Sequence, residues 1–284
     1  MPSRIELLAR NRKFQVCSVI VIIIAMFGIV GPFFTRDPRE IIRKEDGTAR
    51  RWEPPSTEFL LGTDTAGRDV LAQVCVAIRN SLFVGVIAGL LALTIGVIIG
   101  GLLAYKGGLV DETANLTTNI FLVLPQLVVL IVIASVLHSR SLLVVGILIG
   151  LFNWAWMARS IRSQLLSLRE RNFVDLARIS GKGDFSIVAK EILPNMLAYI
   201  FLCLIIGISS AVVVEASISM IGLGPTTAFT LGKMLEWAVS WETHSIGAWW
   251  YFIPPGVILV MFTGTLLMIT AVIDDVLNPK LRTE

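Results

Sequence analysis

Charged residues are scarce in this sequence. Lys, Arg, Asp and Glu together supply 16% of its 284 residues, whereas an average soluble domain has about 25%. Hydrophobic residues supply 55%, and the mean hydropathy is +0.79. The apolar residues gather into long runs, which indicates a chain that spans a membrane rather than one that folds around a soluble core.

Residues that carry chemistry are also few. The three cysteines, Cys17, Cys75 and Cys203, form no CxxC pair, so we expect neither a disulfide framework nor a zinc site. His138 and His244 show no HExxH spacing, so we expect surface residues rather than a metal or proteolytic centre. The net charge of +3 comes with bases that flank apolar runs, which argues against nucleic-acid binding. We therefore predict that the chain is not an enzyme.

Six apolar runs are long enough to cross a hydrocarbon core, which takes about 20 helical residues. They lie at 14–34, 81–105, 115–137, 142–160, 197–215 and 250–273. We expect helices, because backbone polar groups in lipid must be satisfied within their own segment. No small-residue cleavage site follows the first run, so we interpret it as a retained anchor. The predicted fold is an all-α membrane protein with an anchor helix and external loop at 1–80 and a five-helix core at 81–284.

Basic residues predict the orientation in the membrane. Four bases lie before the first run, and seven lie between residues 159 and 190, after the fourth run. Four crossings separate these segments, so both lie on one side, and the positive-inside rule assigns that side to the cytoplasm. We expect a multi-pass protein of the cell membrane with both termini in the cytoplasm.

Glycines punctuate the second run. Gly85 and Gly89, like Gly96 and Gly100, have the small-xxx-small spacing that allows helices to approach closely. We expect these positions to pack against neighbouring helices rather than to line a channel.

A short amphipathic segment precedes the second run. In residues 69–78 the apolar side chains fall on one helical face, which predicts a helix lying along the membrane interface. Asp64 or Thr65 is the expected N-cap of this helix.

Residues 172–195 predict two short helices joined by a turn. Gly181 stands where a helix end favours a left-handed residue, and Asp184 is a suitable cap for the second helix. Leu193 precedes Pro194, which disfavours helical geometry and predicts a bend before the fifth run. An exposed helix–turn–helix at a membrane face suits docking into the groove of a partner.

This segment resembles the "EAA" loop of importer-type ABC permeases. The shared spacing is an acid, an alanine and a glycine, with twelve residues between that glycine and a proline. The family's loop begins Glu-Ala-Ala, whereas this one has Leu176 at the second position. The resemblance implies that the loop couples the chain to ATP-binding subunits through Asp175, Ala177, Gly181, Leu193 and Pro194.

Three further motifs resemble the dipeptide/oligopeptide permease subfamily. They are the stretch LGTDxxGRDV at 61–70, the turn around Gly222 and Gly224, and the ending from Asp275 to Asn278 and Pro279. The sequence departs from the subfamily after Gly224 and in the ending, so the cargo stays open among peptides, oligosaccharides and metal chelates. The resemblance implies a five-helix importer-type permease core.

Glu215 closes the fifth apolar run. An ionisable group near membrane depth is a functional candidate; the alternative is a carboxylate that reaches the interface from a helix end. The subfamily resemblance also has an acid there, which favours a structural or gating role for Glu215 together with Gly222 and Gly224.

No Walker A sequence occurs, because neither glycine–lysine pair has the spacing GxxxxGK[ST]. We therefore expect no cofactor on this chain, with ATP and Mg on partner subunits. The resemblance implies two ATP-binding subunits or domains, a second, distinct permease in a heterodimer and an extracytoplasmic solute-binding protein. The alternative is an ion-gradient-driven secondary transporter, which predicts interrupted helices and midplane charges in two matching halves.

Overall fold

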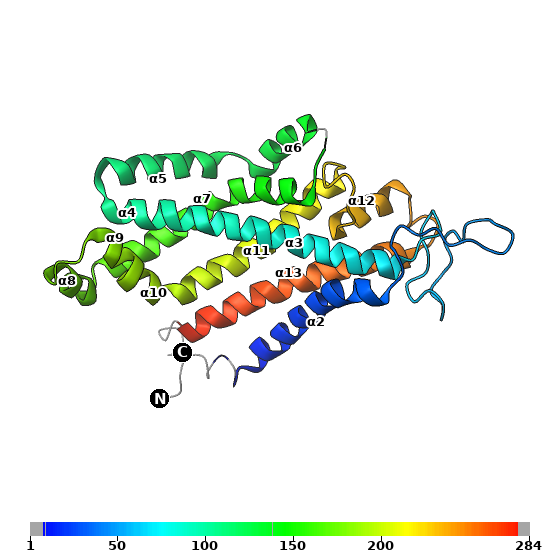
Figure 1. Ribbon diagram of the computed structural model, residues 1–284, viewed down its shortest axis with the longest axis horizontal. Coiled ribbons are helices and arrows are strands. Elements are labelled where there is room, and N and C mark those ends of the chain that lie inside the picture. Colours follow the sequence, from blue (N-terminus) through cyan, green and yellow to red (C-terminus); the bar gives the residue numbers. More distant parts are fainter. Residues whose placement is uncertain (1–7, 9, 138, 278–284) are drawn as a thin grey trace.

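Five helices in the computed structural model are long and apolar enough to cross a membrane, and the number is six if a bent pair of helices counts as one span. The structure describes residues 8, 10–137 and 139–277, so His138, Asn278 and Pro279 lie outside the described residues. The long helices lie side by side (Figure 1). Their bounds are α2 Arg12–Phe34, α3 Val70–Val97, α7 Leu142–Arg169, α11 Leu197–Met220 and α13 Trp249–Leu277.

Helix α3 is longer than the membrane is thick. It continues through a π-helical segment, Ile98–Leu103, and α4, Ala104–Lys106. These 37 residues span about 55 Å, whereas the hydrocarbon core is about 30 Å thick. The prediction of a separate interfacial helix at 69–78 is wrong, because this segment forms the first turns of α3. The helix also runs through residue 80, the boundary expected between the anchor region and the core.

The cap of α3 also differs from the expectation. Asp69 is the N-cap, and its carboxylate accepts a hydrogen bond from the backbone N–H of Leu71 at 2.8 Å. Asp64 lies in the preceding loop, where it organises that loop instead of capping the helix.

The third span is broken. Helices α5, Gly108–Val123, and α6, Gln126–Val136, meet at a bend of 80°. Leu124 is extended because the following Pro125 disfavours the helical region for the residue before it. The expected straight run at 115–137 is therefore two helices, and α5 lies along α7 (Figure 1).

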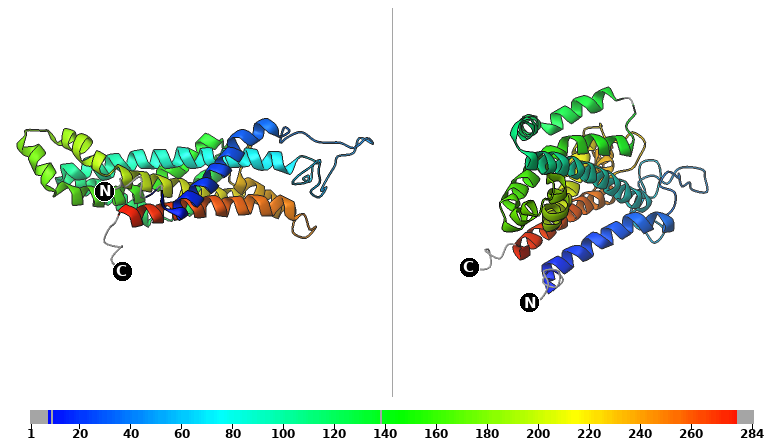
Figure 2. Two further views of the ribbon diagram at one scale, coloured as in Figure 1. Left: turned by 90° about the horizontal axis from the view of Figure 1, so that it is seen from below. Right: turned by 60° about the vertical axis from the view of Figure 1, so that its left-hand side comes forward.

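Helix α3 is the axis of the bundle, since it contacts α2, α7 and α11, while α13 packs on α2 and α11. Figure 2 shows α2 lying obliquely across this bundle. Gly85 and Gly89 of α3 face Ile208 of α11, and Gly96 and Gly100 face α7. The prediction that these glycines serve close helix packing is confirmed.

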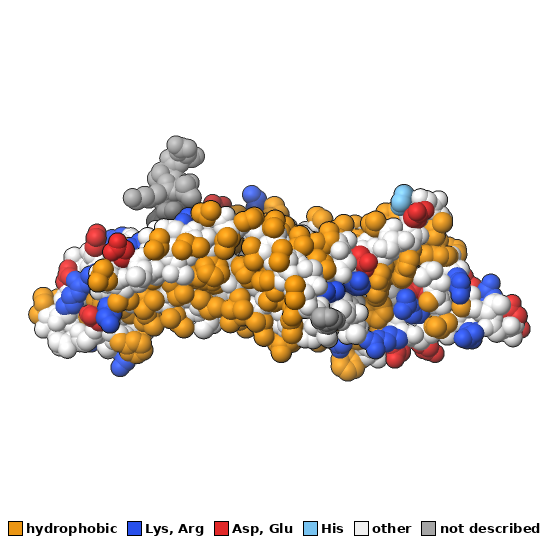
Figure 3. Space-filling view, turned by 90° about the horizontal axis from the view of Figure 1, so that it is seen from above, with side chains coloured by type: hydrophobic (Ala, Val, Ile, Leu, Met, Phe, Trp, Pro, Cys, Tyr) orange, Lys and Arg blue, Asp and Glu red, His pale blue; other side chains and the backbone are white. Residues whose placement is uncertain are grey.

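The bundle has two different ends. At one end, the loop end, lie the segment between α2 and α3 and helix α12, Leu231–Ser240; at the other, the hairpin end, lie the short helices that follow α7 (Figure 1). Figure 3 shows a broad belt of hydrophobic side chains in the middle of the molecule. The charged side chains gather toward its two ends. This pattern is expected of a surface that faces lipid in the middle and water at both ends.

Substitution of Gly100 by Ala tests the close packing of α3 on α7. A Cβ at this position meets the backbone carbonyl of Ala158, so we expect Gly100→Ala to destabilise the protein by about 1–3 kcal/mol. The control is Gly264→Ala in α13, where a Cβ has no neighbour within 4 Å and alanine favours a helix by about 0.5–1 kcal/mol. Thermal unfolding in detergent measures both. Equal stabilities of the two variants would contradict the packing argument.

Candidate functional site

The hairpin end carries the helix–turn–helix predicted from the sequence. Helix α8, Asn172–Ile179, is followed by a turn and by α9, Asp184–Ile187. Gly181 has a φ of +76°, and the Lys182 N–H donates to the Ala177 carbonyl at 3.2 Å. This backbone bond across a left-handed glycine is the Schellman ending of a helix, so the predicted glycine turn is confirmed.

One face of the hairpin is buried against the bundle. Val174, Ile187 and Ile192 are fully buried and pack with Ile161 and Leu165 of α7. The Arg178 guanidinium donates to the Tyr105 hydroxyl at 3.4 Å, which ties α8 to α4. The hairpin is therefore seated on α7.

The other face of the hairpin is apolar and exposed. The side chains of Leu176, Ile179 and Phe185 are 65%, 84% and 71% exposed. Two ion pairs flank them, Asp175 with Arg178 at 3.3 Å and Lys182 with Glu191 at 2.5 Å. Exposed apolar side chains with a charged rim are typical of a protein–protein contact. We call Leu176, Ile179 and Phe185 the hairpin patch.

Two local predictions for the hairpin are wrong. Gly183 takes the N-cap position, and Asp184 is the first residue of α9 rather than its cap. Leu193 is helical, with φ −57° and ψ −42°, because a π-helical segment, Val188–Ile192, leads directly into α10, Leu193–Asn195. Pro194 lies in the first turn of α10, where its missing N–H costs little. The bend before α11 falls at Met196, with φ −110° and ψ 11°.

Glu215 lies in the interior of the protein near the loop end of α11. Its side chain is fully buried, so the alternative of a carboxylate that reaches the interface is wrong. The carboxylate accepts hydrogen bonds from Ser219 at 2.6 Å, from Thr230 at 2.7 Å and from Ser81 at 3.4 Å. A buried carboxylate requires such partners because burial removes its hydration. Since Ser81 belongs to α3 and Thr230 caps α12, Glu215 joins three helices.

The turn after α11 is held by an arginine that the sequence analysis missed. Arg140 donates to the carbonyl oxygens of Gly224 at 3.0 Å, Gly222 at 3.3 Å and Ala134 at 2.8 Å. Gly222 has a φ of +81°, and a Cβ on Gly224 would overlap the Ser219 side chain. The turn is therefore clamped to the end of α6 and lies directly on the Glu215 cluster. No local pattern around Arg140 signals this role, because its two partners in the turn, Gly222 and Gly224, lie 82 and 84 residues away.

The motif before α3 folds into a cap over the loop end. The buried carboxylate of Asp64 accepts hydrogen bonds from the backbone N–H groups of Ala66 and Arg68 and from the Gln73 side chain. The indole N–H of Trp250 donates to the Thr63 carbonyl at 3.2 Å, which attaches the cap to α13. These contacts give the LGTDxxGRDV motif a structural role at this end.

Metal ligands do not come together in the part of the chain that the structure describes, where no group of three His, Cys, Asp or Glu side chains is found. His244 is exposed in the segment after α12. Cys17, Cys75 and Cys203 are buried free thiols.

Comparison with known proteins places most of this architecture in one family. Residues 92–283 match the family described as binding-protein-dependent transport system inner membrane component. The dipeptide transport system permease protein of Bacillus subtilis is 29% identical over 279 residues, which cover 97% of this chain and 84% of the relative. The oligopeptide transport system permease protein of the same organism is 30% identical over 273 residues, covering 96% and 87%. A putative peptide permease protein of Brucella suis is 33% identical over 228 residues, covering 80% and 74%.

Replacement of Glu215 by Ala tests whether the cluster holds α3, α11 and α12 together. The change leaves three hydroxyl groups without their acceptor, so we expect a loss of about 3 kcal/mol or more in the free energy of unfolding. Glu215→Gln keeps an acceptor oxygen and should lose less. The control is Ser217→Ala, since among the described residues the Ser217 hydroxyl donates to the Val213 carbonyl of its own helix. Thermal unfolding in detergent decides, and a Glu215→Ala variant as stable as the control would contradict a joining role.

Proposed function

The chain belongs to the family of binding-protein-dependent transport system inner membrane components, and we propose that it is one permease of an ATP-driven peptide importer. Family membership makes the chain a transport permease and favours the importer over the ion-gradient-driven secondary transporter considered from the sequence. The observation that carries the peptide assignment is the similarity, over nearly the whole chain, to permeases of dipeptide and oligopeptide transport. Oligosaccharides and metal chelates are the other cargoes that the experiment below distinguishes.

The energy for transport comes from partner subunits in this proposal. The sequence has no Walker A loop, and the hairpin patch offers an exposed apolar surface at the hairpin end. We assign that surface, together with Asp175, Ala177 and Gly181, to contact with an ATP-binding subunit. Leu193 and Pro194 belong to the same loop but act from its base, where the chain returns to the bundle.

A continuous series of contacts connects the hairpin with the loop end. The buried face of the hairpin packs on α7, and α7 packs on Gly96 and Gly100 of α3. Toward the loop end, α3 carries Ser81, which bonds to Glu215 and to the first backbone N–H of α12. Closure of the ATP-binding subunits would therefore shift α7 and α3 and strain the Glu215 cluster. The partner subunits would in this way shift the equilibrium between two conformations of the bundle. In this scheme Glu215, Gly222 and Gly224 stabilise the closed conformation of the loop end and act as structural elements of a gate.

The orientation follows from the positions of the bases. Arg159, Arg162 and Arg169 lie on the hairpin-end half of α7, and Arg178 and Lys182 lie in the hairpin itself. By the positive-inside rule we assign this end to the cytoplasm. The loop end then faces outward, where a solute-binding protein would deliver cargo to the cap and α12.

The assembly is tested by purifying the tagged chain in mild detergent and identifying the proteins that accompany it by mass. We expect two ATP-binding subunits or domains and a second, distinct permease. The binding protein of the same system is then screened against peptides, oligosaccharides and metal chelates, and binding of peptides supports the cargo assignment. A chain that purifies alone and moves solute in vesicles without ATP would refute the proposal.

The hairpin patch is tested by the double substitution Leu176→Asp and Ile179→Asp. Both side chains are exposed, so the fold should persist, whereas burial of each in an interface is worth about 1.5–3 kcal/mol. We expect loss of the ATP-binding subunits on purification and at least about tenfold slower transport. The control is Leu60→Asp, a 66% exposed leucine at the loop end, which should retain the subunits. Normal uptake by the double variant would exclude the hairpin as the coupling element.

A further inference from the structure

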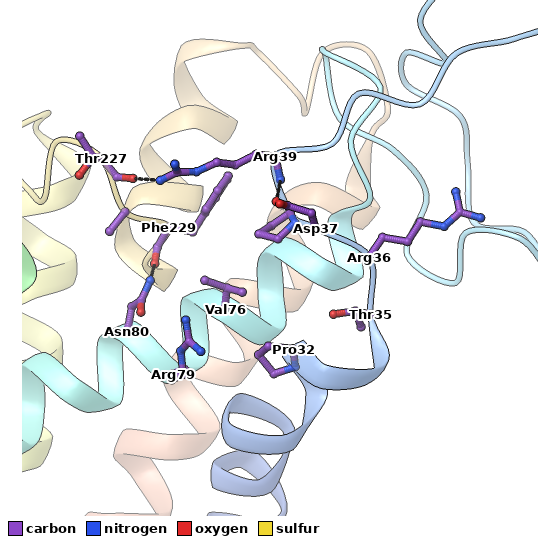
Figure 4. Close-up of a pocket in the computed structure, with 12 residues that line it drawn as sticks. Pro32, Thr35, Arg36, Asp37, Arg39, Val76, Arg79, Asn80, Thr227 and Phe229 are labelled. Atoms are coloured by element: carbon purple, nitrogen blue, oxygen red, sulfur yellow. Dashed lines mark hydrogen bonds between the residues drawn. The ribbon is translucent and has the colours of Figure 1, made fainter.

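A polar pocket of about 560 Å³ opens at the loop end between α2, α3 and the segment that precedes α12. Figure 4 shows its walls: Pro32 and Thr35 at the end of α2, Val76, Arg79 and Asn80 on α3, and Phe229 opposite them. The Asn80 amide donates to the Phe229 carbonyl at 2.7 Å and closes the pocket at that side. Neither the hairpin nor the Glu215 cluster includes these residues.

Positive charge exceeds negative charge in this pocket. Arg36, Arg39 and Arg79 line it, whereas the lining contains a single acid, Asp37. The Asp37 carboxylate accepts a hydrogen bond from the Arg39 backbone N–H at 2.8 Å, and the Arg39 guanidinium donates to the Thr227 carbonyl at 2.7 Å. Arg36 lies 3.8 Å from Glu58, which is outside the pocket.

Arg79 differs from the other two arginines that line the pocket. Within residues 8, 10–137 and 139–277, its guanidinium has no hydrogen bond or ion pair, and Figure 4 shows the side chain rising beside Val76 toward the pocket. A guanidinium presents five N–H donors in a planar fork that matches the oxygen atoms of a carboxylate or a phosphate. The pocket is therefore suited to an oxyanion that contacts Arg79.

The level of Arg79 in the membrane identifies the oxyanion. The apolar run of α3 begins at Ser81, and that of α2 ends at Phe34, so the pocket lies at the edge of the hydrocarbon core. Gly28 of α2 packs against the backbone of Arg79, so the base of the Arg79 side chain lies level with the apolar run of α2. A cation at that depth reaches toward the headgroup region and pairs with an anion there. Lipid phosphate is the anion that the membrane itself supplies at this level.

An apolar groove adjoins the polar pocket. It has a volume of about 370 Å³ and lies between α2 and the first turns of α3, and Thr35 lines both the groove and the pocket. Met26, Phe27, Val30 and Phe34 form its α2 side. A ligand with a phosphate and an acyl chain can contact both the polar pocket and the apolar groove, whereas a free anion contacts the pocket alone.

We propose that this pocket binds the phosphate group of a phospholipid from the leaflet at the loop end, held by Arg79, with an acyl chain in the adjoining groove. The lipid joins α2 to α3 at the point where the two helices cross. The proposal depends only on the chain spanning a membrane and holds for any cargo.

The test measures binding of phosphatidylglycerol to the purified, delipidated full-length chain by native mass spectrometry. We expect Arg79→Gln to weaken binding at least about tenfold, because it removes a charged hydrogen-bond donor, and Arg79→Lys, which keeps the charge, to weaken binding less. The matched control is Arg51→Gln, an exposed arginine of the loop end that does not line the pocket, and it should bind as the wild type does. Diacylglycerol, which lacks the phosphate, should bind at least about tenfold more weakly than phosphatidylglycerol.

Three results would overturn the proposal. Equal lipid binding by the wild type and Arg79→Gln would exclude the pocket, and equal binding of diacylglycerol would exclude the phosphate contact. Inorganic phosphate that competes as strongly as the lipid would identify a free-anion site instead. Thermal unfolding of each variant beside Arg51→Gln separates a binding defect from a folding defect, and Arg79→Lys decides if Arg79→Gln does not fold, since it should bind more weakly than the wild type.

Discussion

The close approach of α3 to α7 and α11 is the constraint on which the rest of this structure depends. In lipid no hydrophobic driving force brings helices together, so association rests on packing of small residues and on hydrogen bonds. Gly85 and Gly89 allow α11 to approach, and Gly100 allows α7 to approach so closely that a Cβ would meet the Ala158 carbonyl. Both candidate regions, the hairpin and the Glu215 cluster, are attached to helices positioned by these contacts.

The two ends of the bundle differ in which side chains are exposed and which are buried. At the hairpin end, apolar side chains on one face of the loop are buried against α7, while the hairpin patch stays exposed outside the lipid belt. At the loop end, buried polar groups are matched one by one: Glu215 with three hydroxyl groups and Asp64 with N–H donors. An exposed apolar patch favours binding of a partner, and a satisfied polar network favours one defined geometry.

The broken span between α4 and α7 has different neighbours on the two sides of its bend. Helix α5 packs on α7, whereas α6 contacts α11 and α7, and the bend at Leu124 and Pro125 leaves backbone groups outside a helix, which need other partners within a membrane. The Gln126 amide donates to the Asn153 side-chain oxygen at 3.1 Å, and among the described residues the Asn153 amide nitrogen is buried without a partner. Arg140 links the far end of α6 to the turn after α11, so movement of this span would reach the Glu215 cluster.

A feature of this protein could be predicted from the sequence when it depends on interactions between residues that are close together in the chain. The spans and the turn at Gly181 follow from local properties, namely run length and the backbone freedom of glycine, and the family motifs needed no structure. The burial of Glu215 did not follow, because Ser81 lies 134 residues away from it in the sequence. Nor did the clamp by Arg140, the continuity of α3 through residues 69–78 or the pocket around Arg79. Local propensity favoured an interfacial helix at 69–78 and a bend at Leu193, but the first segment continues into α3 and Leu193 continues the helical segment Val188–Ile192 into α10. Which polar groups are buried, and against what, is set by segments that meet only after the bundle assembles.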